Sequence, residues 1–242
     1  MFSGVKSLKE FCCGKGLRLS LIAVILGIMV LAPMVAAAKN PNPGVLPVDS
    51  TPFGKTYADW SEEWWKWAVS IPADSNPVTD TTGEYCAVGQ SGKVWFLAGT
   101  FGETGVVRNC TIPVGKAIFF PIFNNEGSAI EGYGDNEADL RAYAIQYDKD
   151  IKLLEVIVDG KSLKDLKNYR ATSGLFDIWL PPNNVWGITT GPDGISSISV
   201  SDGYWIMLAP LSAGKHTIHI HTRLEADFIF ESEVTYNLEV KP

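Results

Sequence analysis

The sequence contains little of what most enzyme and nucleic-acid-binding sites need. Its 242 residues include three histidines and four cysteines. It has no G-x-S-x-G nucleophile motif, no phosphate-binding loop and no dinucleotide fingerprint. Twenty basic residues stand against 27 acidic ones, a formal net charge of −7. Because a nucleic-acid partner needs a basic face, this balance argues against one.

Long hydrophobic runs are also missing. The longest apolar run, residues 19–32, is about 14 residues, against the roughly 20 that cross a bilayer. It follows a basic start and precedes the small residues 36–38, the order of a secretory signal cleaved near Lys39. The alternative is an uncleaved membrane anchor, but the apolar run is too short to favour it. We predict that residues 1–38 are removed, leaving a secreted, periplasmic or cell-surface protein with no membrane span. Four basic residues and one acid leave with them, so the net charge becomes −10.

Two cysteines remain in the mature chain, because Cys12 and Cys13 lie in the predicted signal. We expect Cys86 and Cys110 to form a disulfide, since an exported protein meets an oxidising compartment. Closing a loop of about 25 residues stabilises a fold by roughly 3 kcal/mol in the chain-entropy model. The C-x-x-C spacing of a redox-active pair is absent, and a metal site would need further soft ligands.

Tryptophan is abundant, with four of the eight in residues 60–67. A helix is predicted here, because Thr56 and Asp59 form a capping pair and Pro72 ends the pattern. Aromatic and apolar residues recur at spacings of three and four, which predicts a buried stripe made of Tyr57, Trp60, Trp64, Trp67 and Ile71. Trp65 points roughly 110° from the centre of that stripe. We therefore expect Trp65 to contact a ligand or a second packing surface.

The chain beyond residue 72 consists mainly of short β-rich runs separated by glycines and turn residues. Strands are predicted at residues 94–98, 106–112, 117–123, 153–158, 175–180, 195–200, 204–209, 216–224 and 232–240. One further helix is predicted over residues 135–148. These gaps are too short for crossover helices, so the sequence predicts a mainly β protein, an antiparallel β-sandwich or jelly roll. We assign residues 39–55 to a Pro-rich linker and 56–242 to one domain, with a subdivision near residue 150 as the alternative.

Four motifs carry a resemblance to other proteins. They are Tyr57-x-x-Trp60-Ser-x-Glu-Trp64-Trp65-x-Trp67, Gly89-Gln-Ser-Gly-x-Val-Trp-Phe-Leu-Ala-Gly99, Arg108-x-Cys110-Thr-x-Pro-x-Gly-Lys116 and Pro210-Leu-Ser-x-Gly-Lys-His216-Thr-Ile218. Over most of its mature part the chain resembles a set of uncharacterised exported proteins of bacteria and archaea. The resemblance implies export and a common fold. It implies no catalytic residue, because that set has no assigned activity.

The three histidines lie together in residues 216–221. Strand alternation puts His219 and His221 on one face, where both could ligate one Zn²⁺ ion. In a hairpin centred near Phe228, His219 faces Asn237 and His221 faces Thr235, so no carboxylate lies directly beside them. A shift of one pair would bring Glu233 or Glu239 closer. This pattern favours a solvent-facing polar strand, and we expect no metal here.

The 26 acidic residues of the mature chain are too many for a catalytic pair to be chosen, and catalytic residues stay unassigned. One group lies in the Gly-rich loop before the second predicted helix: Glu126, Glu131, Asp135, Glu137 and Asp139. Its oxygen-rich composition would suit Ca²⁺, but it matches no EF-hand pattern. We expect no cofactor, with Ca²⁺ and Zn²⁺ as the lesser alternatives.

An excess of tryptophan without a catalytic constellation favours a secreted, non-enzymatic protein that binds carbohydrate or another cell-envelope ligand. The candidate ligand-binding residues are Trp65, Trp179 and Trp186, with Trp205 as a further exposed aromatic. Prolines and asparagines between Trp179 and Trp186 mark a loop, where binding residues are frequent. The alternatives are a hydrolase of envelope polymers that uses acidic-loop carboxylates and a structural envelope component.

Overall fold

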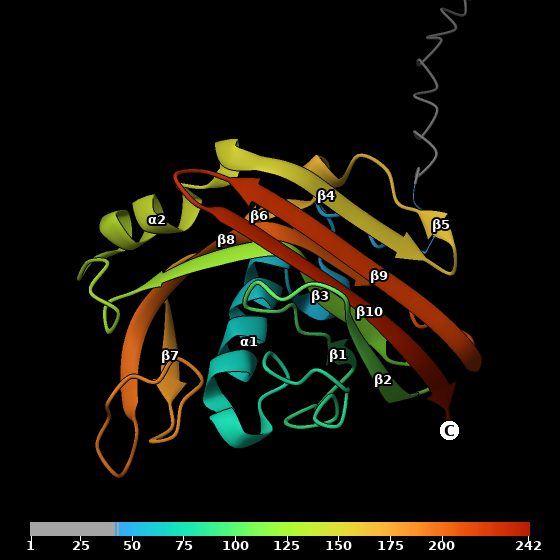
Figure 1. Ribbon diagram of the computed structural model, residues 1–242, viewed down its shortest axis with the longest axis horizontal. Coiled ribbons are helices and arrows are strands. Elements are labelled where there is room, and N and C mark those ends of the chain that lie inside the picture. Colours follow the sequence, from blue (N-terminus) through green and yellow to red (C-terminus); the bar gives the residue numbers. More distant parts are fainter. Residues whose placement is uncertain (1–41, 43) are drawn as a thin grey trace, which may run out of the picture. The chain divides into compact units, whose positions relative to one another are not determined.

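The computed structural model describes residues 42 and 44–242 (Figure 1). The predicted signal, residues 1–38, lies outside the described residues, as do residues 39–41 and 43 of the predicted linker. The described part is mainly β and contains two sheets of five strands with two α-helices. Among the described residues, no helix is long and apolar enough to span a membrane.

The helix-covered sheet contains the strands in the order β1-β3-β8-β6, with β7 also paired to β8. Its strands are β1 (Val94–Phe96), β3 (Ala117–Ser128), β6 (Arg170–Thr172), β7 (Phe176–Leu180) and β8 (Ile195–Leu208). The outer sheet has the order β2-β10-β9-β4-β5. Its strands are β2 (Val106–Pro113), β4 (Ile151–Val158), β5 (Lys161–Ser162), β9 (Gly214–Glu225) and β10 (Ile229–Lys241). The helices are α1 (Tyr57–Ser70) and α2 (Glu137–Ile145).

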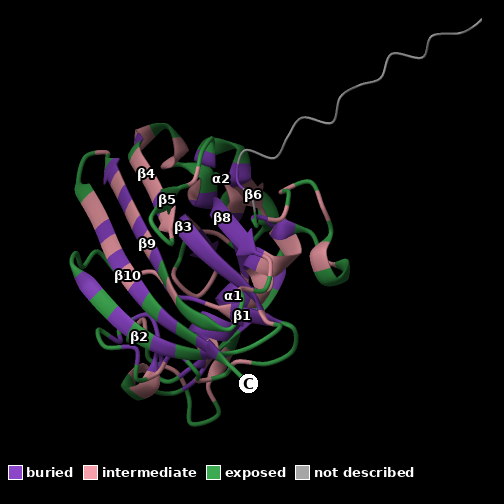
Figure 2. Cartoon of the chain, turned by 90° about the vertical axis from the view of Figure 1, so that its right-hand side faces the viewer, coloured by how far each residue is buried: buried purple, intermediate pink, exposed green. Residues whose placement is uncertain are grey.

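The two sheets stack as a sandwich, which confirms the predicted fold class. Most strand pairs are antiparallel, but β1 pairs with β3 and β2 pairs with β10 in parallel. The sheets are therefore mixed, because the chain passes from β1 in one sheet to β2 in the other and back to β3. Buried residues alternate with exposed ones along β2 and with half-buried ones along most of β9, so the outer sheet has one face toward the core and one toward solvent (Figure 2).

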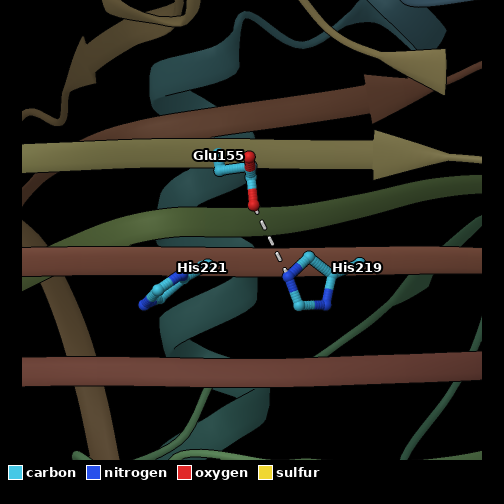
Figure 3. Close-up of side chains that lie close together, drawn as sticks. All are labelled: Glu155, His219 and His221. Carbon is cyan, nitrogen blue, oxygen red and sulfur yellow. Dashed lines mark ion pairs between the residues drawn. The ribbon is translucent and has the colours of Figure 1, made fainter. Parts of the chain in front are cut away.

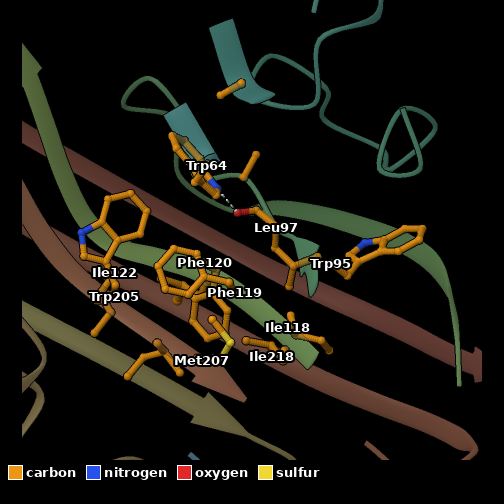
Figure 4. Close-up of a cluster of buried hydrophobic side chains, with 14 of the residues drawn as sticks. Trp64, Trp95, Leu97, Ile118, Phe119, Phe120, Ile122, Trp205, Met207 and Ile218 are labelled. Carbon is orange, nitrogen blue, oxygen red and sulfur yellow. Dashed lines mark hydrogen bonds between the residues drawn. The ribbon is translucent and has the colours of Figure 1, made fainter. Parts of the chain in front are cut away.

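Helix α1 covers the other face of the helix-covered sheet, next to β6, β7 and β8. Thr56 and Asp59 form the predicted capping box, and the backbone turns extended at Ile71, before Pro72. Four members of the predicted stripe are buried, and Trp60 is half-buried against Phe119. The rings of Phe119 and Trp205 stack at 5.2 Å, and Trp64 packs edge-on to Trp205 (Figure 4). Strands β3 and β8 are consequently buried on both faces.

Strands β3 and β8 each include a polar segment that was not predicted to be part of a strand. Strand β3 continues to Ser128, and β8 is one strand of 14 residues where two were predicted. The additional segments are polar and pair with each other, with Glu126 opposite Ser201 and Asn125 opposite Asp202. Hydrophobic periodicity could not find them, because their residues are mostly polar although the segments lie inside the protein.

The described part of the predicted linker lies against the folded body. Val45 forms an antiparallel bridge to Leu208, and the Leu46 amide donates to the Met207 carbonyl at 2.8 Å. The Tyr57 hydroxyl donates to the Leu46 carbonyl at 2.6 Å. One hydrophobic core includes residues on both sides of residue 150, from Val45 to Val240.

The disulfide between Cys86 and Cys110 is present and joins the long loop after α1 to β2. Burial of the Asp80 carboxylate in this loop would raise its pKa. Four hydrogen bonds from Thr82, Gly83 and Tyr85 instead hold the pKa below its usual range. The loop is therefore fixed both covalently and through its own backbone.

Candidate functional site

A cavity of about 200 Å³ lies between α1, the second half of β3 and the surrounding loops. Its aromatic lining consists of Trp64, Trp65, Phe101, Tyr143, Trp186 and Phe230, and its polar lining of Thr100, Asn124, Asn125, Glu126 and Glu131. Phe101 is 47% exposed, which places it at the mouth. Aromatic walls with a few convergent polar groups are the usual composition of a small-molecule site.

Two of the predicted ligand-binding tryptophans meet at this cavity. Trp65 is 9% exposed and packs edge-on against Trp64, with ring centroids 5.1 Å apart. Trp186, which reaches the cavity from the loop after β7, lies 6.4 Å from the Trp65 ring. The Trp64 indole donates to the Leu97 carbonyl at 2.9 Å, which fixes the inner wall (Figure 4). Trp65 therefore forms a second packing surface, one of the two alternatives predicted for it, and it also lines the cavity; its predicted exposure is wrong, because it is buried between Trp64 and Trp186.

The other tryptophan candidates lie elsewhere. Trp179 is 43% exposed on β7, and its indole donates to the Asp193 carbonyl at 3.3 Å. It does not line the cavity. Trp205 was predicted as an exposed aromatic, and this is wrong, because it is fully buried beneath Trp64 and Phe119.

Buried polar atoms without partners concentrate at this cavity. Among the described residues, five buried side-chain polar atoms have no donor or acceptor partner, and three belong to cavity residues. These are the indole nitrogen of Trp65, the amide nitrogen of Asn124 and one carboxyl oxygen of Glu126. An unsatisfied buried polar group costs about 1–3 kcal/mol, so native proteins keep few of them. Their grouping marks this wall as one suited to a polar ligand.

Glu126 is the most perturbed acid of the site. It is 6% exposed, and burial raises the pKa of its carboxyl well above the usual range. The neighbouring carboxyl of Glu131 raises that pKa further, while a hydrogen bond from the Ser199 hydroxyl opposes the shift. The Ser128 hydroxyl in turn donates to Glu131 at 2.6 Å. Burial is the largest of these effects and favours the neutral acid at Glu126.

This position of Glu126 corrects the predicted acidic loop. Glu126 belongs to strand β3, while the carboxylate of Asp139 accepts from Asn136 at the start of α2, and Glu137 pairs with Arg141. Asp135 shares the Asn136 amide with Asp139, and in the part of the chain that the structure describes these five acids form no group with metal-ligand spacing. A run of strand length without glycine or proline, residues 122–126, is the signal that could have placed Glu126 on a strand.

The opposite wall is held in place by Arg108 of β2, which is 1% exposed. Its guanidinium donates to the Tyr236 hydroxyl and to the backbone carbonyls of Val78 (3.0 Å), Asp80 (2.6 Å), Ala98 (2.9 Å) and Gly99 (3.1 Å). Val78 and Gly99 line the cavity. One buried cation thus joins the two loops that form this wall, and sequence inspection gave no indication of it.

The histidine strand has a different register from the predicted one. In the β9–β10 hairpin, His219 lies opposite Thr235 and His221 opposite Glu233. The predicted register was wrong by one pair, because the turn is centred on Asp227, between the paired Glu225 and Ile229. A carboxylate therefore does lie beside the histidines.

His216, at the start of β9, contacts Asp159 at 2.7 Å through Nδ1. Partial burial would lower the pKa of His216, but the Asp159 carboxylate and the Ser212 carbonyl together raise it. This histidine has its own local partners and is separate from the other two.

Comparison with known proteins adds no function. A scan against protein-family models gave no match, and neither a search of curated proteins nor one of solved structures gave any. The fold and the cavity define a two-sheet, mainly β protein with an aromatic-walled pocket. Its function therefore has to be argued from the pocket.

Proposed function

We propose that this protein is a secreted binding protein that takes a small polyhydroxylated ligand, about the size of one sugar ring, into the cavity between α1 and β3. The observation that carries this proposal is the coincidence of aromatic walls with three unpaired buried polar atoms. Neither feature alone would indicate a ligand, since buried tryptophans are common and isolated polar defects occur.

The chemistry of a sugar matches both features. Its C–H faces pack on rings such as Trp65 and Trp186, and its hydroxyls both donate and accept. The N–H groups of Trp65 and Asn124 need acceptors, and a neutral Glu126 carboxyl can donate as well as accept. A volume of about 200 Å³ is below the roughly 300–1,000 Å³ of sites for drug-sized ligands, which suits a single ring.

The predicted export signal and the disulfide support a location outside the cytoplasm, since disulfides persist in oxidising compartments. We propose that the ligand is a component of the cell envelope or its surroundings. The resemblance to exported proteins supports the same location.

A hydrolase is the second candidate, and the paired carboxyls of Glu126 and Glu131 are the observation that favours it. A buried acid with a raised pKa can serve as a general acid. Glycosidases, however, place two carboxyls roughly 5–9.5 Å apart across the scissile bond. The aromatic walls and the unpaired polar atoms favour binding over hydrolysis.

The test is thermal unfolding of the purified protein against mono- and disaccharides, followed by calorimetric titration of any that shift it. A ligand that binds only the native state raises stability by about 2.7 kcal/mol at a hundredfold excess over Kd. Trp65→Phe keeps an aromatic ring and removes the N–H group. It should weaken binding by about tenfold, which corresponds to the loss of one hydrogen bond to the ligand. Trp186→Ala should weaken it further.

Trp179→Ala is the matched control, because it removes an exposed tryptophan outside the cavity. If it abolishes binding while Trp186→Ala does not, the cavity is not the site. Absence of a shift with every saccharide would contradict the proposed ligand class. Chromatography of saccharide incubated with the protein separates the two candidates, since cleavage products lost in Glu126→Gln would establish a hydrolase.

A further inference from the structure

The solvent face of the outer sheet brings two histidines and a glutamate from separate strands together. Glu155 of β4 reaches across to β9, where His219 and His221 lie side by side (Figure 3). The His219 Nε2 atom is 3.7 Å from a Glu155 carboxyl oxygen. One ligand atom from each of the three residues lies within 4.8 Å of the other two. Within the described residues, this is the one group of histidine, cysteine and acidic side chains with such spacing.

Each imidazole is already held through one ring nitrogen. Nδ1 of His219 contacts the Thr235 hydroxyl at 3.0 Å, and Nε2 of His221 contacts Glu231 at 2.8 Å. Arg223 donates to the other oxygen of Glu231 at 2.8 Å, which fixes that carboxylate. Histidines that bind metals characteristically use one nitrogen for the ion and the other for such an orienting partner. The second nitrogen of each ring is thus available to an ion.

We propose that Glu155, His219 and His221 bind one divalent transition-metal ion of the Zn²⁺ type on the outer face of the sheet. Two imidazoles and a carboxylate form a ligand set that Zn²⁺ prefers, whereas Ca²⁺ takes six to eight oxygens. The Glu233 carboxylate, 3.9 Å from His219 Nε2, or a water completes the coordination. This site is separate from the aromatic cavity and does not depend on its proposed function.

The required movement is small. Tetrahedral Zn²⁺ with bonds near 2.0–2.1 Å places its ligand atoms about 3.4 Å apart. The three atoms lie within 4.8 Å of one another, so these partly exposed side chains must close by at most about 1.4 Å. Rotation about side-chain bonds supplies this without moving the strands, whose pairing fixes the Cα positions.

A competing arrangement uses the same residues without a metal, as solvent-facing pairs of histidine and glutamate. Such pairs contribute about 0–1 kcal/mol each and bind no ion stoichiometrically. A titration with Zn²⁺ therefore distinguishes the two arrangements, because the metal site alone binds the ion stoichiometrically. The protein is purified without a histidine tag, treated with EDTA, dialysed and titrated with Zn²⁺ in a calorimeter.

The expected result is saturable binding of one Zn²⁺ per chain. His219→Gln and His221→Gln should each weaken the affinity by more than about 100-fold, since loss of an orienting partner alone costs 10–100-fold. Thr235→Val, which removes that partner from His219, should weaken it by about tenfold. Cu²⁺ bound at the site should show hyperfine coupling to two nitrogens in its electron paramagnetic resonance spectrum.

His216→Gln is the matched control, since it removes a histidine of the same strand that contacts Asp159 instead. Circular dichroism and thermal unfolding of each variant show whether it is folded. The Cu²⁺ spectrum of the unmutated protein identifies the ligands without any variant, so misfolding cannot affect it. The proposal is overturned by absence of stoichiometric binding, by equal affinity in His219→Gln, by an equal loss in His216→Gln, or by a Cu²⁺ spectrum without two coupled nitrogens.

Discussion

Replacing Glu126 by glutamine tests the polar wall of the cavity most directly. Burial raises the pKa of this carboxyl well above its usual range, and Glu131 adds to the shift. In the unfolded chain the pKa of a glutamic acid is about 4.3. The folded state therefore keeps its proton at pH values where the unfolded state has lost it. The stability due to Glu126 is complete below about pH 4.3 and declines as the pH rises toward the folded pKa.

One group that changes its protonation between the folded and unfolded states gives a slope of at most about 1.4 kcal/mol per pH unit. Glutamine has nearly the same shape, does not titrate, and keeps an oxygen for the Ser199 hydroxyl. The free energy of unfolding of Glu126→Gln minus that of the unmutated protein should thus grow with pH by up to that amount per unit. The difference should level off once the pH passes the folded pKa.

Urea unfolding followed by tryptophan fluorescence, from about pH 4.5 to about pH 8.5, measures this difference. Most other acids titrate equally in both proteins, so their contributions cancel. Glu84→Gln serves as the control, because Glu84 is exposed. A difference curve that stays flat over the whole range, or falls, refutes the assignment of Glu126 as a buried acid kept in its neutral form.

Three further predictions concern the framework around the cavity, each measured by chemical or thermal unfolding. Arg108→Met should destabilise the protein by about 3 kcal/mol. The buried carbonyls lose their hydrogen-bond donor, and part of that loss is offset because a cation no longer has to be buried. A change below about 1 kcal/mol would contradict this. The double change Cys86→Ser and Cys110→Ser should remove about 3 kcal/mol, and an unchanged Tm would show that the closed loop adds nothing. Gly203→Ala should destabilise by about 1–3 kcal/mol, because its Cβ would lie 2.5 Å from the Phe123 carbonyl oxygen. The control, Gly191→Ala, meets no atom within 4 Å, so an equal loss there would argue against a steric cause.

Features that depend on neighbouring residues could be predicted. Helix α1 follows from a capping pair, a stripe at three- and four-residue spacing and a terminating proline, all within 17 residues. The Cys86–Cys110 pairing follows from elimination, because these are the two cysteines outside the predicted signal. The β-sandwich follows from strand-length runs too close together for crossover helices. In each case the prediction needs only the spacing of nearby residues or the number of cysteines.

The sites depend on which distant segments become neighbours. Trp65 meets Trp186 because α1 lies against β7 and the loop after it, a contact across 121 positions of the chain that no periodicity encodes. Glu126 is buried because polar halves of β3 and β8 pair with each other, which removes the hydrophobic signal of a strand.

Glu155 joins the histidines because β4 pairs with β9, which places Glu155 opposite His221, and a shift of one pair in this register would separate the ligands. Strand register is set by the packing of whole faces and by the turns between strands. Side-chain chemistry along the chain therefore determined which elements form, while sheet pairing determined which functional groups meet.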